Sequence, residues 1–268
     1  ERASGRAALR RALLDERLER ALQRREDDPE LLVVGRRGIR HGAGGLELRP
    51  LVADRAQPIL SAQALGHPLI PDAQRVCNDV TLSAPGDLLL ITGSNMSGKS
   101  TFLRTAGVNL ALAYAGGPVA AAVLHVRPLR LFTCIRVTDS LADGISYFYA
   151  EVQRLKTLLD ELAREHEAPV LFLIDEIFRG TNNRERLIGS RAYIRAAIGQ
   201  NGVGILATHD LELVHLADDI PQITNMHFAE TIVDGRMAFD YTLRPGPCPT
   251  TNALLIMRMA GLPVPDAP

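Results

Sequence analysis

The stretch that decides the fold runs from Leu88 to Ser100 and reads Leu88-Leu89-Leu90-Ile91-Thr92-Gly93-Ser94-Asn95-Met96-Ser97-Gly98-Lys99-Ser100. Its first part, Leu88 to Thr92, is almost wholly apolar and predicts a buried strand. The rest, Gly93 to Ser100, fits the pattern G-x-x-x-x-G-K-[ST] at every fixed position. Ser100 to Tyr114 predicts a helix directly after this loop. A strand, a glycine-rich loop and a helix in this order are the context in which the pattern binds the phosphates of a nucleotide.

The spacing of the loop has a physical reason. The two glycines let the backbone curl so that its N–H groups converge on a phosphate, and the following helix adds the partial positive charge of its N-terminus. Lys99 is expected to reach the phosphates as a mobile charge and to assist catalysis, and the Ser100 hydroxyl to ligate Mg²⁺. The expected nucleotide contacts of this segment are Gly93, Ser94, Asn95, Met96, Ser97, Gly98, Lys99, Ser100 and Thr101.

Two carboxylates follow the most apolar predicted strand, Val170 to Ile174. Asp175 is expected to hold Mg²⁺, directly or through water. Glu176 is placed to polarise an attacking water as a general base. The alternative is a strand that merely ends at a charged turn, and the glycine-rich loop upstream argues against it.

His209 ends the next apolar strand, Val203 to Thr208. This position lies on the edge where parallel α/β sheets bind ligands. A structural histidine is the alternative, but the place favours a sensor of the terminal phosphate or of water. A partly protonated imidazole would donate a hydrogen bond to that phosphate.

The remaining pattern predicts an α/β fold with a mostly parallel central sheet, flanking helices and a peripheral antiparallel strand set. From about Leu46 onward, short apolar strands alternate with helices. The other predicted elements are a strand at Leu131–Val137, helices at Ile145–Glu165, Arg184–Gly199 and Asn252–Ala260, and late strands at Ile223–Phe228, Glu230–Val233 and Met237–Tyr241, with a turn at Asp234-Gly235.

The first 45 residues are predicted to be separate from the domain at 46–268. Leucines at helical spacing predict a helix from about Arg6 to Glu26. A packing helix is favoured over a basic DNA-facing helix because acids are interspersed among its arginines. The stretch from Gly35 to Gly45 is predicted to be a turn or linker, whose arginines are either solvated or in contact with phosphates.

Composition excludes several classes of protein. The 268 residues carry a formal net charge of -1, with 46% hydrophobic and 23% charged residues, so the totals do not indicate a nucleic-acid or membrane-binding surface. The three cysteines are far apart and predict reduced thiols of a cytoplasmic protein. No apolar run is long enough to span a bilayer, and no signal peptide is present. Because the chain opens at Glu1, we expect a longer protein upstream.

Several segments together resemble the MutS family. Asn95-Met96 inside the loop is distinctive, and the other segments are Asp175-Glu176-Ile177-Phe178-Arg179-Gly180-Thr181, Ala207-Thr208-His209, Ile223-Thr224-Asn225-Met226-His227-Phe228 and Gly66-His67-Pro68. Their order and spacing agree with the family from roughly Leu65 to Leu262. The resemblance implies a P-loop NTPase of ABC type that hydrolyses ATP with Mg²⁺ and serves DNA repair or recombination.

The resemblance also implies a head-to-tail dimer, here a homodimer, in which each site is completed by a serine of the other subunit. Ser146, within Asp139–Phe148, matches that serine and would contact ATP in trans; an ordinary helix N-cap is the alternative. Asn78 matches a nucleotide-binding asparagine, and Glu151 a family acid for which we expect an ion pair only. DNA is expected to be contacted by parts of the longer protein outside this chain.

Three departures indicate a divergent paralogue without a mismatch-recognition domain. Arg75 stands where the family usually has a phenylalanine near the adenine, and an arginine can stack on a purine. Phe178 replaces a frequent glycine, and Asn182-Asn183 replace small hydroxyl residues.

Two other functions stay open from the sequence. One is a different ABC-type motor, SMC-like or of a transporter, although no Leu-Ser-Gly-Gly-Gln signature precedes Asp175. The other is a non-catalytic nucleotide-binding dimerisation module, against which the intact charged residues argue.

Overall fold

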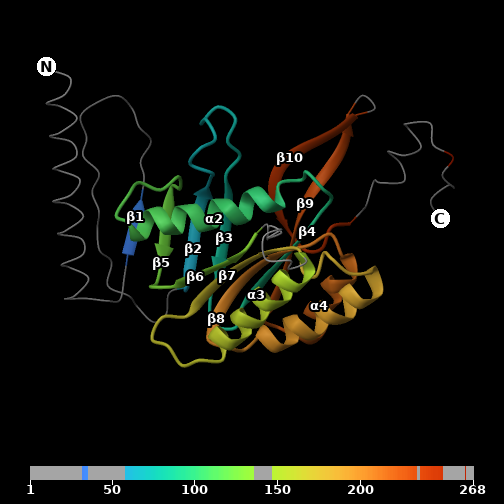
Figure 1. Ribbon diagram of the computed structural model, residues 1–268. Helices are drawn as coiled ribbons and strands as arrows, with labels where there is room; N and C mark the ends of the chain where they lie inside the picture. Colours follow the sequence, from blue (N-terminus) through green and yellow to red (C-terminus); the bar gives the residue numbers. More distant parts are fainter. Residues whose placement is uncertain (1–31, 36–57, 136–146, 234–235, 250–262, 264–268) are drawn as a thin grey trace, which may run out of the picture.

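The structure is a computed structural model that describes residues 32–35, 58–135, 147–233, 236–249 and 263 (Figure 1). Its main sheet has the strand order β10-β9-β4-β8-β7-β6. The strands are β4 (Leu88–Thr92), β6 (Arg130–Cys134), β7 (Val170–Asp175), β8 (Gly202–Ala207), β9 (Ile223–Val233) and β10 (Arg236–Pro245). Neighbouring strands from β9 to β6 are parallel, whereas β10 runs antiparallel to β9. The predicted α/β fold with a mostly parallel sheet and an antiparallel edge is confirmed.

The interior strands are buried on both faces, and this explains their apolar sequences. All six residues of β7 and all six of β8 are buried. Because successive side chains point to opposite faces, Leu171 and Leu173 join one hydrophobic cluster while Phe172 and Ile174 join the other. The sheet therefore separates two cores.

Helices cover both faces of the sheet (Figure 1). On one face lie α3 (Tyr147–Leu162) and α4 (Asn183–Ala197), whose leucines, isoleucine and tyrosine form one core together with η1 (Leu211–His215) and α5 (Leu216–Asp219). On the other face lies α2 (Lys99–Tyr114). The predicted helices at 100–114, 145–165 and 184–199 correspond to α2, α3 and α4.

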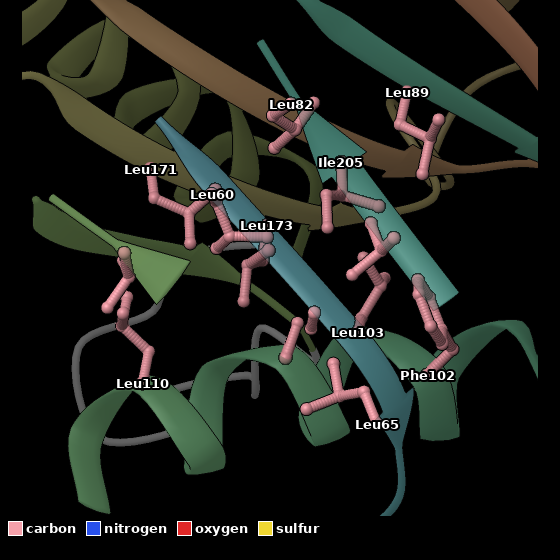
Figure 2. Packing of buried hydrophobic residues seen from close by; sticks show 14 of the residues in the cluster. Leu60, Leu65, Leu82, Leu89, Phe102, Leu103, Leu110, Leu171, Leu173 and Ile205 are labelled. Carbon is pink, nitrogen blue, oxygen red and sulfur yellow. The ribbon is translucent and has the colours of Figure 1, made fainter. Parts of the chain in front are cut away.

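A second, antiparallel sheet packs beyond α2, and no single strand of it was predicted. Its order is β1-β5-β2-β3, with β1 (Leu32–Gly35), β2 (Leu60–Leu65), β3 (Asn78–Leu82) and β5 (Val123–Val126). Leu60 and Leu65 of β2 belong to the same hydrophobic cluster as Phe102 and Leu103 of α2 and Leu173 of the main sheet (Figure 2). This packing fixes the 66–77 segment, which connects β2 to β3, over the start of α2.

The late strands differ from the prediction. β9 is one continuous strand instead of two, because residues 223–227 pair with β4 while residues 226–233 pair with β10. β10 pairs with Phe228 and Glu230, on either side of Ala229, so the strand continues where the sequence alone indicated a break.

Some predictions fall on residues outside the described ranges: the helix at Arg6–Glu26, residues 36–45 of the linker, Ser146, the Asp234-Gly235 turn and the helix at Asn252–Ala260. The division into 1–45 and 46–268 stays a prediction, and β1, which precedes residue 46, pairs with β5. No helix of the described part is long and apolar enough to cross a membrane.

The strand register places the predicted site residues at one edge. Ala207 at the end of β8 lies opposite Ile91 of β4 and opposite Asp175 of β7. The segments that follow these strands, which begin at Gly93, Glu176 and Thr208, therefore emerge side by side, as expected for the ligand-binding edge of a parallel sheet.

Candidate functional site

The glycine-rich loop leaves β4 with backbone angles that favour glycine. Gly93 has φ 143° and Gly98 has φ 112°, in the region that L-residues rarely adopt. A Cβ at Gly93 would also lie 2.7 Å from the carbonyl oxygen of Phe228. Both glycines are therefore required by the tight path of the loop.

Lys99 is buried beneath this loop. Its Nζ donates hydrogen bonds to the carbonyl oxygens of Gly93 and Ser94, each at 2.7 Å. Burial lowers the pKa of the ammonium, while the nearby carboxylates of Glu176 and Asp175 oppose this shift. A buried ammonium whose partners are two neutral carbonyls is poised to gain a better, anionic partner.

Two hydroxyls of the loop are buried and lie outside the lining of both cavities. The hydroxyl oxygens of Ser94 and Ser97 are buried and have no hydrogen-bond partner among the described residues. No acidic residue lies in the first turn of α2, and its N-cap Gly98 offers no side chain to the free N–H groups. Unsatisfied donors at a helix N-terminus are suited to an anion, so the residues present fit a phosphate group.

Ser100 and Asp175 meet across the loop. The Ser100 Oγ donates to Asp175 Oδ2 at 2.7 Å. Arg179 also holds Asp175, through a 2.8 Å hydrogen bond to its carbonyl oxygen and a 3.3 Å contact to Oδ2. One hydroxyl and one carboxylate form a minimal oxygen ligand set, which fits Mg²⁺ because this ion keeps several waters and uses few protein ligands. No cluster of three or more His, Cys, Asp or Glu within the described residues offers another metal site.

Glu176 follows β7 in a left-handed conformation, with φ 68°. Its backbone N–H donates to the carbonyl oxygen of Ala207, which ties the residue to the end of β8. Oε2 accepts from His209 Nδ1 at 2.8 Å and, at 3.4 Å each, from the Thr208 hydroxyl and the His209 backbone. These three contacts occupy one carboxylate oxygen and leave Oε1 for a reacting group.

His209 lies between Glu176 and Arg186. Its Nε2 is 3.3 Å from Nη2 of Arg186, and Arg186 holds Asp210 through Nε at 2.8 Å and Nη2 at 2.9 Å. The hydrogen bond with Glu176 raises the pKa of His209, and burial and the Arg186 guanidinium oppose this. The imidazole is 46% exposed, so this side of the site faces outward.

Two adjoining cavities bring these residues together. The larger, about 760 Å³, reaches from the loop to an apolar wall, and the smaller, about 410 Å³, is lined by charged groups. Asn95, Ser100, Asp175, Glu176 and Arg179 line both cavities. The larger also exposes the predicted Asn78, Met96, Gly98, Lys99 and Thr101, and the smaller exposes His209 together with Arg104 and Arg186.

Asn78 lies on the wall of the larger cavity but serves the fold. Its Nδ2 donates to the carbonyl oxygen of Tyr241 at 3.0 Å, and its Oδ1 accepts from the backbone of Leu243 at 2.7 Å. These bonds hold an irregularity of β10 between Phe239 and Leu243, where Tyr241 has φ 56°. Asn78 thereby places the half-exposed Tyr241 ring on the cavity wall.

The expected stacking residue, Arg75, does not line either cavity, and this prediction is wrong for the described conformation. Its Nε and Nη2 donate to the carbonyl oxygen of Ile70 at 3.0 and 2.7 Å, and Nη2 lies 2.6 Å from Asp72. The guanidinium is thus hydrogen-bonded within the segment that connects β2 to β3. The cavity wall there is apolar and includes Leu69 and Val76.

Glu151 of α3 binds the backbone of the segment that follows β7, a role that the sequence did not predict. Its buried carboxylate accepts from the backbone N–H groups of Phe178 at 2.7 Å and Arg179 at 3.2 Å. Burial raises its pKa, and these hydrogen bonds oppose the shift. Instead of forming the simple ion pair expected, Glu151 holds the segment that follows Asp175 and Glu176.

The packing of Phe178 accounts in part for a phenylalanine at a position where the family often has glycine. Phe178 has φ 56°, a conformation that suits the glycine frequent in the family. Its ring packs between Phe148 and Tyr193, at 6.4 and 6.2 Å between ring centroids. Aromatic packing between α3 and α4 offsets the strain of this backbone. Asn182 caps α4 by accepting from the backbone of Glu185.

Two comparisons with known proteins bear on the family of this chain. The family model described as MutS domain V matches residues 89–265, most of the chain. The chain belongs to the MutS family. One curated relative, "DNA mismatch repair protein MutS 2" of Halobacterium salinarum, is 34% identical over 223 residues, which cover 79% of this chain and 25% of the relative. This member therefore spans about a quarter of the length of the MutS relative that it matches.

The sequence found the charged residues of the site and missed others. Asp175, Glu176, Lys99 and His209 lie around the adjoining cavities as expected. Ser146 lies outside the described residues. Tyr241, Arg186 and Arg104 were missed because no short motif contains them; each reaches the cavities through the packing of β10, α4 or α2. No disulfide joins Cys77, Cys134 or Cys248.

Proposed function

We propose that this domain is a P-loop NTPase of ABC type that binds ATP with Mg²⁺ in the adjoining cavities and hydrolyses it to ADP and phosphate. One observation carries the proposal: Lys99, the Ser100–Asp175 pair and the Glu176–His209 pair line two cavities at the edge of the parallel sheet, and Ser100, Asp175 and Glu176 line both of them. Membership of the MutS family supports it.

The phosphates would be held by the glycine-rich loop. Lys99 would exchange its two carbonyl partners for phosphate oxygens, and the Ser94 and Ser97 hydroxyls would gain acceptors. Ser100 and Asp175 would hold Mg²⁺, which when bound neutralises charge on the phosphate oxygens.

Glu176 would act as general base through Oε1. It accepts a proton from water as the water oxygen bonds to the terminal phosphorus and the bond to the ADP oxygen breaks. His209 Nδ1 and the Thr208 hydroxyl keep the other oxygen, Oε2, occupied. The carboxylate is thereby oriented before the reaction, which lowers the cost of reaching the transition state.

The nucleobase of ATP would lie at the apolar end of the larger cavity. Tyr241, Leu69 and Val76 offer a flat aromatic face and aliphatic surface there, and aromatic rings stack favourably on bases. The same cavity is also lined by His67 and Gln74; we expect the aromatic and aliphatic surface to contribute binding mainly by stacking.

A second copy would complete the site. His209 is 46% exposed and the charged cavity faces outward, and Ser146 of another subunit matches the family serine that acts in trans. ATP would thus join two such domains, and hydrolysis would separate them. Because the curated relative is named as a DNA mismatch repair protein, we assign the switch to a DNA-handling protein.

The test is Mg²⁺-dependent ATP hydrolysis by the purified domain over a wide range of protein concentration, with Glu176→Gln and, as a matched control, the exposed Glu167→Gln. We expect specific activity to rise with concentration, and Glu176→Gln to lose turnover by roughly 100-fold while forming an ATP-stable dimer. Activity that is independent of concentration would remove the trans role of Ser146. Equal activity of Glu176→Gln and Glu167→Gln would refute the assignment of the base.

A further inference from the structure

Arg186 enters the charged cavity from α4 and contacts His209 on the side opposite Glu176. Its side chain is 12% exposed, and both oxygens of Asp210 accept from it. Asp210 is itself held, since its backbone N–H donates to the Thr208 hydroxyl at 3.0 Å. The guanidinium is therefore fixed in position relative to the imidazole ring.

The chemistry of the two groups limits the protonation of His209. A guanidinium only donates hydrogen bonds, so the 3.3 Å contact from Nη2 is favourable only if Nε2 of His209 carries a lone pair. The carboxylate of Glu176 only accepts when ionised, so the 2.8 Å contact at Nδ1 requires a proton there. Both contacts select the same neutral tautomer, with its proton on Nδ1.

A doubly protonated ring is the competing state. Glu176 raises the pKa of His209 and favours that state. A proton on Nε2 would however lie against the Nη2 protons of Arg186, and no other acceptor within hydrogen-bonding distance of Nε2 is found among the described residues. Arg104 and Arg179 also line this cavity and are cationic, whereas Asp175 lines it as an anion. Asp210 adds to the rise in the pKa of His209, and it does so from the far side of the Arg186 guanidinium that it binds.

We propose that Arg186 is a positioning residue that fixes His209 in the Nδ1–H tautomer, so that His209 holds Oε2 of Glu176 and leaves Oε1 for the attacking water. The functional part of this inference rests on the proposed ATPase activity, and the tautomer itself does not. Arg186 acts through His209 and need not touch the substrate. For the nucleotide-free domain this proposal assigns a neutral ring held between an acceptor and a donor, whereas the sequence-based expectation was a partly protonated imidazole.

The first test is a two-bond ¹H–¹⁵N correlation spectrum of the histidine rings near neutral pH, without nucleotide. His209→Gln assigns the His209 signals, and Arg186→Met is compared with Arg191→Met. Arg191 lies on the same helix and pairs with Glu212, so it controls for the loss of an ion pair between α4 and the segment after β8.

The wild type and Arg191→Met should show a neutral Nδ1–H ring. Arg186→Met should show a mixture that includes the doubly protonated ring. An Nε2–H or doubly protonated ring in the wild type would overturn the proposal, and so would a spectrum unchanged in Arg186→Met.

The second test is steady-state ATP hydrolysis by the same variants. Arg186→Met should lower kcat on the order of tenfold with KM nearly unchanged, less than the roughly 100-fold contributed by a general base. A kcat equal to that of Arg191→Met would refute the role in positioning. A wild type without hydrolysis would refute the proposed function, and the ring spectra would still decide the tautomer.

Discussion

At one end of the cavity, the polar groups come from a contiguous loop and from the residues that directly follow β7 and β8. At the other end, the wall is built from Leu69, Val76 and Tyr241, which lie far apart in the sequence. The first end depends on backbone geometry, such as φ 143° at Gly93. The second depends on packing of the antiparallel sheet and on the Asn78 bonds to β10. The difference predicts that changes at the charged end alter chemistry, whereas changes at the apolar end alter affinity.

The largest effect is expected for Lys99→Met. It removes the ammonium that would bind the phosphates, and we expect loss of both ATP binding and turnover by at least about 100-fold. Because burial of this ammonium opposes its charge, the variant should unfold at a temperature equal to or above that of the wild type. Calorimetric ATP titration and thermal unfolding measure the two effects; tight ATP binding by the variant would contradict the placement of the phosphates.

Glu151→Gln should have a smaller effect at the same end. Glutamine offers one acceptor oxygen to the two N–H groups of Phe178 and Arg179, and an unsatisfied buried donor costs about 1–3 kcal/mol. We expect kcat to fall roughly tenfold, because misplacing catalytic groups slows reaction, with little change in KM. Asp160→Asn, on the exposed face of the same helix, serves as control; equal kinetics of the two variants would remove Glu151 from the positioning of the site.

Tyr241→Ala tests the apolar end. Base–aromatic stacking contributes about 1–3 kcal/mol, so KM for ATP should rise roughly tenfold while kcat stays near the wild-type value. Tyr241→Phe keeps the ring and should behave like the wild type. A fall in kcat without a change in KM would contradict the division of the cavity into two ends.

The smallest effect is expected for Asp240→Asn, beside Tyr241. The Arg244 guanidinium lowers the pKa of Asp240 from 3.8 to about 2, and both side chains are more than a third exposed, so the pair should contribute less than about 1 kcal/mol. With a folded-state pKa below the unfolded value, this contribution is present above about pH 4 and is lost as the pH falls toward about 2. Unfolding curves against pH should converge for variant and wild type at the acid end; a difference that grows as pH falls would contradict the assignment.

The sequence predicted the charged end well because its causes are local. Gly93, Lys99 and Ser100 are fixed by one loop, and Asp175, Glu176 and His209 lie at or just after the ends of buried parallel strands. The apolar end could not be predicted in the same way. Arg75 was expected to stack on the nucleobase because of its place in the sequence. Its guanidinium is instead bound to the carbonyl oxygen of Ile70 and the carboxylate of Asp72.

Tertiary pairing also decided features of the fold that patterns missed. β9 continues through Ala229 because β10 pairs with the residues on either side of it, Phe228 and Glu230. Tyr241 reaches the cavity only because Asn78, far upstream, binds the irregular segment of β10. Arg186 meets His209 because Asp210 fixes its guanidinium. In each case the deciding contact joins residues that no short motif contains.

The most direct test of the central claim is hydrogen–deuterium exchange of the domain with and without saturating Mg²⁺ and ATP. One nucleotide that spans the cavity should protect the amides of residues 93–100 and those around Tyr241 in parallel, with the same dependence on ATP concentration. Lys99→Met should abolish both protections together. Protection at neither end would contradict nucleotide binding in this cavity. Protection of the loop alone would contradict the assignment of the apolar end to the nucleobase.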